Sequence, residues 1–351
     1  MVDRRDFLKF AAAGPAALGA QTSRGPIRAA VFGLEHSHTT GKFKAMKDSP
    51  DYQVAAVWDP DPAVRARAQK EPLFQGVPFV DDAAMLADGS IELVVVECHV
   101  WEALDRGERV IAAGKHLHLE KPPGNDLGRF QALAAEARRK KLLLQTGYVW
   151  RWHEGVNAAI EAARKGWLGR VHMVRGNMSA DRDAVQRAVE ARYKGGGFFE
   201  LAGHAIDPTV RLLGRPSKVQ GWFRHHTGVD DRLADNSVAV FEFEQALAVI
   251  TQSARMAGAT DYRCFEVIGT DGSFLVHPES NPPRMRVYLR EARGSYKAGW
   301  QDVALPPQPR FVGDFRELAR AIRSGTALEL SYEHELLLQE TLLRAAGEIK
   351  G

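Results

Sequence analysis

An alternation of short apolar runs and amphipathic stretches is the feature that most constrains the fold. Runs rich in Val, Ile, Leu and Ala are typical of strands buried on both faces of a parallel sheet, and they occupy residues 27–32, 53–58, 91–96, 116–119 and 142–146. Between them lie stretches with helical periodicity at 63–70, 101–113 and 127–140. Strands that alternate with helices predict a doubly wound α/β domain.

The length of the chain predicts more than one domain, because its 351 residues exceed a compact domain of about 100 to 200 residues. With 45% hydrophobic and 26% charged residues, the composition is that of a globular protein. Its net charge of +3 comes from interleaved acidic and basic residues, so nucleic acid is not an expected partner. No run of about 18 apolar residues predicts a stable membrane span.

Residues 1–26 have the pattern of an export leader. Arg4-Arg5 precedes Phe7-Leu8-Lys9, and an Ala- and Gly-rich stretch continues to Ala20. This order resembles a twin-arginine signal, which directs folded bacterial proteins across the inner membrane. We therefore expect a periplasmic or secreted protein; the alternative is a charged or amphipathic N-terminal helix.

The turn after the first run departs from a dinucleotide-binding fingerprint. Such a turn usually reads Gly-x-Gly-x-x-Gly, which lets the backbone approach a pyrophosphate; here only Gly33 remains, and Glu35 and His38 take the other places. Asp59 ends the second run, where a carboxylate accepts hydrogen bonds from ribose hydroxyls and favours NAD over NADP. Alternatively, Asp59 starts a turn before Pro60.

Two further motifs carry chemistry. Run 116–119 ends in Glu120-Lys121-Pro122, which places a lysine at the carboxyl edge of the sheet, where its ammonium could hold a reacting hydroxyl. Three glycines at 195–197 precede a predicted helix in which four titratable residues share one face: Glu200, His204, Asp207 and Arg211. The alternatives are an exposed loop lysine and a solvated helix face.

Together these motifs resemble the glucose–fructose oxidoreductase, inositol dehydrogenase and rhizopine-catabolism (Gfo/Idh/MocA) family. The likeness covers nearly all of residues 27–351 and includes Gly-Gly-Gly-x-x-Glu-x-x-Gly-His-x-x-Asp. It implies a Rossmann domain over 27–148 and an α+β substrate-binding and oligomerisation domain over 149–351, with an open, mainly antiparallel sheet. Its strands are expected at 219–224, 237–244, 247–255, 263–269, 273–277 and 284–290.

The resemblance also implies the site and the reaction. His204 would act as general base on a hydroxyl of a sugar, polyol or glycoside, with Lys121 as electrostatic partner and Glu200 as helper. Arg151 and Asp207 are expected near the substrate. NAD or NADP, tightly bound, is the expected cofactor, and its contacts would be Gly33, Leu34, Glu35, His36, Asp59, Glu120 and Lys121. A homo-oligomer, dimer or tetramer, is expected.

Export adds a constraint, because the periplasm holds no replenished pool of nicotinamide nucleotide. A resident NAD recycled within each catalytic cycle, in a redox-neutral reaction, follows as a hypothesis. Two alternatives remain open: a carbohydrate-binding or scaffold protein without cofactor, and a metal-assisted hydrolase or lyase. The metal ligands of the second alternative would come from Glu35, His36, His38 and His99.

Overall fold

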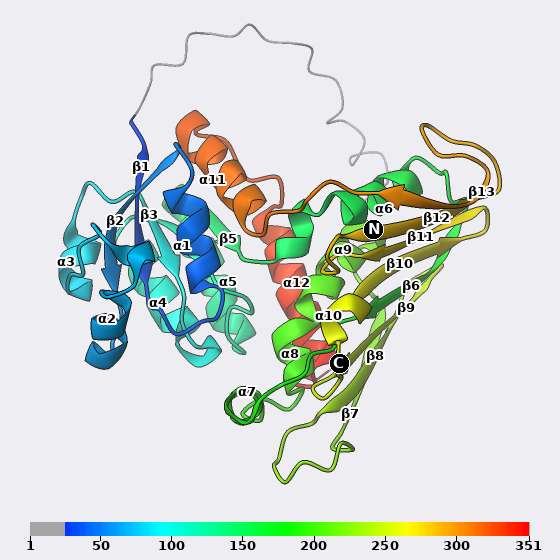
Figure 1. Ribbon diagram of the computed structural model, residues 1–351, viewed down its shortest axis with the longest axis horizontal. Coiled ribbons are helices and arrows are strands. Elements are labelled where there is room, and N and C mark those ends of the chain that lie inside the picture. The colour runs from blue at the N-terminus through cyan, green and yellow to red at the C-terminus, as the bar shows by residue number, and fades with distance from the viewer. Residues whose placement is uncertain (1–24, 351) are drawn as a thin grey trace, which may run out of the picture.

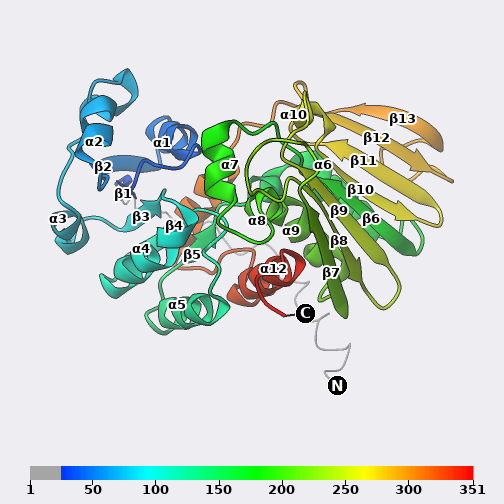
Figure 2. The ribbon, with the colours of Figure 1, turned by 90° about the horizontal axis from the view of Figure 1, so that it is seen from below.

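The structure, a computed structural model, describes residues 25–350 (Figure 1). The predicted leader, residues 1–26, lies almost wholly outside these residues. The described chain forms a five-stranded sheet and an eight-stranded sheet, with helices between them (Figures 1 and 2). The predicted fold class, a Rossmann domain followed by an α+β domain, is confirmed. No helix among the described residues is long and apolar enough to cross a membrane.

The first sheet is parallel, with strand order β2-β1-β3-β4-β5. Its strands are β1 (Ile27–Phe32), β2 (Tyr52–Trp58), β3 (Leu93–Val96), β4 (His116–Leu119) and β5 (Leu144–Thr146). The helices are α1 (Thr39–Lys47), α2 (Pro62–Ala68), α3 (Asp82–Ala87), α4 (Val100–Ala112) and α5 (Leu127–Arg139), with a 3-10 turn η2 (Pro72–Phe74). Every residue of β3 is buried, as expected for a strand covered on both faces. The carboxyl ends of β1, β3 and β4 therefore meet at one edge.

The second sheet has the order β13-β12-β11-β10-β6-β9-β8-β7 and is antiparallel except where β6 pairs with β9. Its strands are β6 (Val171–Asn177), β7 (Lys218–Arg224), β8 (Asn236–Glu242), β9 (Leu247–Ser253), β10 (Cys264–Gly269), β11 (Gly272–His277), β12 (Arg284–Leu289) and β13 (Gly299–Ala304). Helices cover one face of this sheet (Figure 2). In β8, alternate residues are buried, so that face holds the core.

The segment predicted as one helix after the three glycines is two helices. The elements between the sheets are η3 (Val149–Trp152), α6 (Glu154–Arg164), α7 (Ala184–Glu190), α8 (Gly197–Leu201), α9 (Gly203–Leu213) and α10 (Ala259–Tyr262). The break falls at Ala202, before Gly203, which packs so closely on the Tyr148 ring that a larger residue would overlap it. The predicted titratable stripe is also buried rather than solvated at His204 and Asp207.

The C-terminal helices return to the first domain. Helix α11 (Val312–Ser324) contributes Phe315 and Leu318 to a buried cluster with residues of β1, α1 and β2, and Phe311, directly before the helix, belongs to the same cluster. Helix α12 (Tyr332–Ala345) packs on α5 and α9 and so lies between the domains (Figure 1). The expected division at residue 148 therefore does not hold for α11, because its apolar face completes the core of the Rossmann domain.

Candidate active site

The turn after β1 is held by an ion pair within the first domain. Arg106 of α4 donates to both carboxylate oxygens of Glu35, at 3.1 and 2.7 Å. Gly33 has φ +109° and lies so close to the Arg106 guanidinium and the Glu97 carbonyl that any side chain there would overlap them. The Glu35 side chain, which replaces a glycine of the usual fingerprint, is thus drawn onto α4.

Asp59 organises the same turn. Its carboxylate accepts hydrogen bonds from the backbone N–H groups of Leu34 (2.8 Å) and Asp61 (2.9 Å), and it is fully buried. Burial and the nearby Glu35 carboxylate raise the pKa of Asp59. This arrangement matches the alternative in which Asp59 starts a turn, and a contact with ribose hydroxyls stays a prediction.

A buried charge cluster follows at the carboxyl ends of β3 and β4. Lys42 of α1 donates to Glu97 at 2.6 Å and also pairs with Glu120. Burial would raise the pKa of Glu120, but His36, Lys42 and His38 lower it well below its usual range. Burial raises the pKa of Glu97 to about 7, although Lys42 opposes the shift. Lys42 was not predicted, because its position on a helix gave no sign that it is buried.

Lys121 joins the two domains at this edge. Its ammonium lies 2.6 Å from Glu200 Oε1 and donates to the Glu200 carbonyl at 3.0 Å. Burial would raise the pKa of Glu200, but the charge of Lys121 and the hydrogen bond from His36 lower it to about 2. Glu200 therefore pairs with Lys121, one of the two residues that the family pattern predicted it to help.

His204 lies in α9, close to this pair, with its ring 5.6 Å from that of Tyr148 and 6.3 Å from that of Trp150. It is buried, and its Nδ1 has no hydrogen-bond partner among the described residues. Burial and then the charge of Lys121 lower its pKa well below the usual value. His204 is therefore neutral at physiological pH, the state in which an imidazole can accept a proton.

Arg151 and Asp207 serve a structural network. Arg151 Nε donates to Asp207 Oδ1 at 2.9 Å, and its other nitrogens donate to Glu335 of α12 at 2.6 and 2.8 Å. His334 Nε2 lies 2.8 Å from the same Asp207 oxygen. Both predicted substrate contacts are buried, and neither lines the cavity described next. Buried charges pair with one another, and here they join η3, α9 and α12, so a contact of either residue with the substrate stays a prediction.

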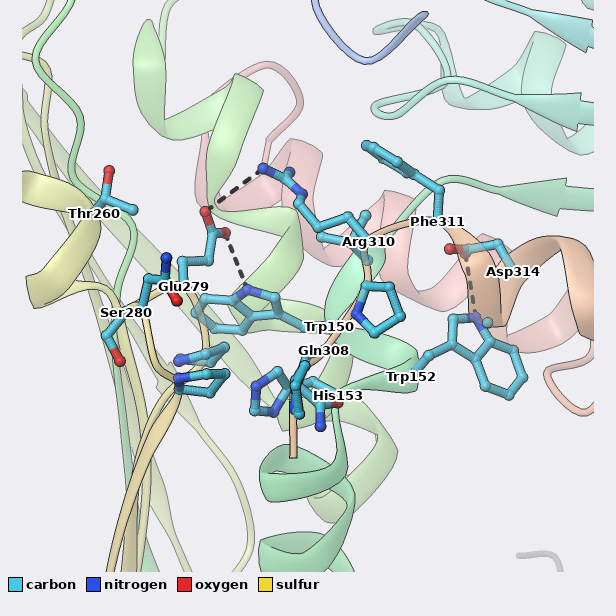
Figure 3. Close-up of a pocket in the computed structure, with 17 residues that line it drawn as sticks. Trp150, Trp152, His153, Thr260, Glu279, Ser280, Gln308, Arg310, Phe311 and Asp314 are labelled. Carbon is cyan, nitrogen blue, oxygen red and sulfur yellow. Dashed lines mark hydrogen bonds and ion pairs between the residues drawn. The ribbon is translucent and has the colours of Figure 1, made fainter. Parts of the chain in front are cut away.

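A cavity of about 470 Å³ opens beside η3, which supplies Trp150 and Trp152 to its wall. Figure 3 shows Trp150, Glu279 and Arg310 together in its wall, with Trp152 and Asp314 forming a second pair further along. Trp150 Nε1 donates to Glu279 Oε1 at 3.2 Å, and Arg263 lies 2.6 Å from Glu279 Oε2. Aromatic faces beside fixed carboxylate and guanidinium groups are the lining expected of a small-molecule site.

The cavity adjoins the reacting groups through two residues. Trp150 lines it and also faces His204, and Arg310 lines it while its guanidinium lies 3.4 Å from His38 Nε2. Sequence reasoning missed Trp150, Glu279 and Arg310. The aromatic run 149–152, directly after β5 at the sheet edge, is the signal that could have indicated the first of them.

The structure brings together only part of the group of metal ligands considered from the sequence. Glu35 forms an ion pair with Arg106, and the His99 ring stacks on the Trp101 ring, with the centroids 4.2 Å apart. The group whose ligand atoms lie within 4.8 Å of one another consists of His36, His38 and Glu120. Glu35 and His99 follow neighbouring strands, as expected, but their side chains turn to α4.

Fold and site together define a Rossmann-type oxidoreductase. Two family models match: "Oxidoreductase family, NAD-binding Rossmann fold" over residues 27–148 and "GFO/IDH/MocA C-terminal domain" over 156–275. The chain belongs to the Gfo/Idh/MocA family, as the sequence motifs predicted. It is thus an enzyme of the oxidoreductase class, and its first domain is of the NAD-binding kind.

Relatives span most of the chain. An uncharacterized oxidoreductase of Schizosaccharomyces pombe is 25% identical and covers 92% of this chain and 96% of the relative. Myo-inositol 2-dehydrogenase of Thermotoga maritima is 27% identical over 76% of this chain and 79% of its own length. The structure of levoglucosan dehydrogenase in complex with NADH and levoglucosan is 18% identical and has a TM-score of 0.76, covering 91% and 97% of the two chains. The last likeness concerns the fold.

The turn after β1 fits NAD through its backbone. The N–H groups of Glu35, His36 and Ser37 have no acceptor within the described part of the chain, and they precede the N-terminus of α1. Free N–H groups at such a terminus bind phosphate oxygens. Because Glu35 is neutralised by Arg106, its carboxylate does not leave an unpaired negative charge there. These N–H groups would hold the phosphates, and Lys121 would lie at the reacting end.

Proposed function

We propose that the protein oxidises or reduces a hydroxyl-bearing carbon of a sugar, polyol or glycoside. The observation that carries this proposal is the buried Lys121–Glu200 pair beside neutral His204, next to an aromatic-lined cavity. The names of relatives such as myo-inositol 2-dehydrogenase support the substrate class. NAD, when bound, supplies the hydride acceptor.

In this proposal the side chains move and hold a proton. Lys121 binds the substrate oxygen through its ammonium and stabilises the negative charge that develops there. Neutral His204 accepts the hydroxyl proton. Glu200 keeps the lysine charged and oriented, and the domain junction excludes water because all three residues are largely buried.

We further propose export by the twin-arginine route and a resident cofactor that is recycled in a redox-neutral reaction. The Arg4-Arg5 pair with Phe7-Leu8-Lys9 supports export. An exported enzyme meets no replenished nucleotide pool, so it needs a cofactor that stays bound. Cell fractionation of the full chain and of the Arg4→Lys/Arg5→Lys variant tests export, because the variant should remain in the cytoplasm.

The first experiment identifies the nucleotide. The full chain is produced in a host with a twin-arginine pathway, purified without added nucleotide and denatured, and the released molecules are analysed by mass spectrometry. Near-stoichiometric NAD or NADP is expected. A protein that releases none and binds none on titration would contradict the proposal and favour the carbohydrate-binding alternative.

A second experiment tests the reaction. The purified protein is mixed with a panel of polyols, free sugars and glycosides while the near-ultraviolet absorbance of bound reduced nicotinamide is followed. A substrate should produce a transient signal without accumulation of free NADH. Steady accumulation of free NADH would overturn the redox-neutral part of the proposal and leave the dehydrogenase part intact.

A homo-oligomer also remains a proposal. Trp222, Tyr288 and Trp300 are partly exposed on strands of the second sheet, and exposed aromatic residues support a protein contact. Light scattering coupled to size-exclusion chromatography should give a mass of two or four chains, and a monomer would refute it.

A further inference from the structure

We propose that His36, His38, Glu120 and Glu97 bind one divalent transition-metal ion at the carboxyl edge of the Rossmann sheet. These residues come from the turn after β1 and from the ends of β4 and β3, three strands that are adjacent in the sheet. The proposed hydride transfer uses neither the His36 side chain nor the His38 side chain. The ion's presence does not rest on the proposed function; only its role toward a substrate does.

The spacing of the ligand atoms suits a small ion. His38 Nδ1 lies 3.1 Å from Glu120 Oε1, and His36 Nδ1 lies 3.9 Å from Glu97 Oε2. With metal–ligand distances of about 2.0 to 2.2 Å, ligand atoms of a tetrahedral site are about 3.3 Å apart. The ligand atoms of His36, His38 and Glu120 lie within 4.8 Å of one another, so side-chain rotations would bring them to this spacing around an ion.

The hydrogen bonds of His36 give it the form that a ligand needs. The backbone N–H of His38 donates to His36 Nδ1 at 3.2 Å, so this nitrogen carries a lone pair rather than a proton, and the ion would replace this hydrogen bond. Its Nε2, which then carries the proton, lies 3.5 Å from Glu200 Oε1. Metal-binding histidines commonly direct the second ring nitrogen at a carboxylate in this way.

Glu97 supplies an independent observation. It is fully buried, its Oε1 accepts from Lys42 at 2.6 Å, and its Oε2 has no hydrogen-bond partner within the described residues. A buried carboxylate oxygen without a partner is unfavourable. This oxygen lies on the His36 side of the cluster, where an ion between the four residues would contact it.

Lys42 leaves one oxygen free on each of two carboxyl groups. The carboxyl groups of Glu97, Glu120 and Glu200 contact the ammonium groups of Lys42 and Lys121. Lys42 contacts Oε1 of Glu97 and Oε2 of Glu120, so the ion would take Oε2 and Oε1, the other oxygen of each carboxylate.

The ligand types indicate the kind of ion. Two imidazole nitrogens and two carboxylate oxygens suit Zn²⁺, Mn²⁺ or Fe²⁺, whereas Mg²⁺ and Ca²⁺ prefer oxygen ligands alone. Because Glu200 links His36 to Lys121, the ion would lie beside the reacting groups. There it would act as a Lewis acid on a substrate oxygen that binds as a fifth ligand.

The test measures metal and nucleotide in one sample. The full chain, carrying an affinity tag without histidine, is purified without chelator, and its metal content is determined by plasma mass spectrometry. After removal of metal by a chelator, Zn²⁺ and Mn²⁺ are titrated back by calorimetry. We expect about one ion per chain and rebinding of one of the two metals.

Variants identify the ligands. His36→Ala/His38→Ala should weaken binding by more than about 100-fold, the upper range for loss of a mere outer-shell partner. The matched controls His99→Ala, from the set that sequence alone suggested, and His172→Ala, exposed on β6, should leave the dissociation constant unchanged. Circular dichroism checks folding, and His36→Gln with a Co²⁺ visible spectrum replaces the double variant if it does not fold.

The outcomes separate this site from the proposed cofactor. A double variant that is folded and binds metal as tightly as the wild type would overturn the site, as would a wild type that neither contains nor rebinds metal. Metal without nucleotide would support the site and contradict the resident cofactor. Nucleotide without metal would do the reverse.

Discussion

The turns after β1 and β4 leave the same edge of one sheet but neutralise their charges in different ways. After β1, Glu35 pairs with Arg106 of its own domain; after β4, Lys121 pairs with Glu200 of the second domain. An ion pair within a domain stabilises that domain, whereas one across the junction depends on both domains and here belongs to the proposed catalytic group. Substitutions in the turn after β1 should therefore lower stability, and substitutions in the turn after β4 should lower catalytic activity.

The largest expected effect is on catalysis. Lys121→Met should lower the rate of substrate turnover by about 10³-fold, because the charge that stabilises the developing alkoxide is lost. The rate of product formation is the measurement. Lys44→Met is the control, since Lys44 is exposed on α1 and pairs with Asp48 at the surface. A Lys121→Met enzyme with unchanged turnover would remove the lysine from the reaction.

The turn after β1 should respond in stability. Arg106→Met leaves Glu35 partly buried without a partner, and we expect a loss of about 3 kcal/mol in the free energy of unfolding. Urea denaturation gives this value. Glu35→Gln/Arg106→Met should recover part of the loss, and the exposed Arg109→Met is the control. Equal losses in the single and double variants would argue against an internal pair.

The second domain should show a pH-dependent stability that comes from a buried acidic residue, Glu190. Burial raises the pKa of Glu190 on α7 to about 7, although Arg182 opposes the shift. Between about pH 4.5 and 7 the folded protein keeps a proton on Glu190 that the unfolded chain has lost. The free energy of unfolding therefore falls as the pH rises through this range. Relative to Glu190→Gln, the wild type should lose about 2 kcal/mol over this range. Thermal unfolding of both proteins from pH 4.5 to 8 measures it, and parallel curves would contradict the shift.

The smallest effect separates the two roles of Asp59. Asp59→Ala should cost 1 to 2 kcal/mol, about the value of a lost cap, because two backbone N–H groups lose their acceptor. Denaturation and NAD titration are the measurements. Asp61→Ala, which removes only the cap of α2, is the control. Unchanged NAD affinity supports the turn role, and a loss of affinity above about 10-fold would support a ribose contact.

Much of the fold could be predicted because strands of a doubly wound sheet are short apolar runs. The predicted runs 27–32 and 116–119 coincide with β1 and β4. Strands β6 and β13 were not predicted. β13 is an edge strand whose residues are at most half-buried, so it lacks an apolar pattern, and β6 carries the exposed polar residues His172 and Arg175.

The part of the site that lies in sequence motifs was predictable. The part that depends on how distant segments pack together was not. Lys121, Glu200 and His204 were expected together from their motifs, and the pairing of the first two is observed. The partner of Glu35 is 71 positions away and depends on where α4 lies on the sheet. Trp150, Glu279 and Arg310 meet only because three distant segments fold around one cavity, which no local pattern encodes.

The return of α11 to the first domain has a consequence for biosynthesis. Phe311, Phe315 and Leu318 complete the apolar core beside β1, yet they leave the ribosome after the whole second domain has been synthesised. The N-terminal part of a nascent chain therefore keeps an open apolar surface until the last helices emerge. Such a chain needs its full length before its core can close, and fragments that stop before residue 324 should aggregate or bind chaperones.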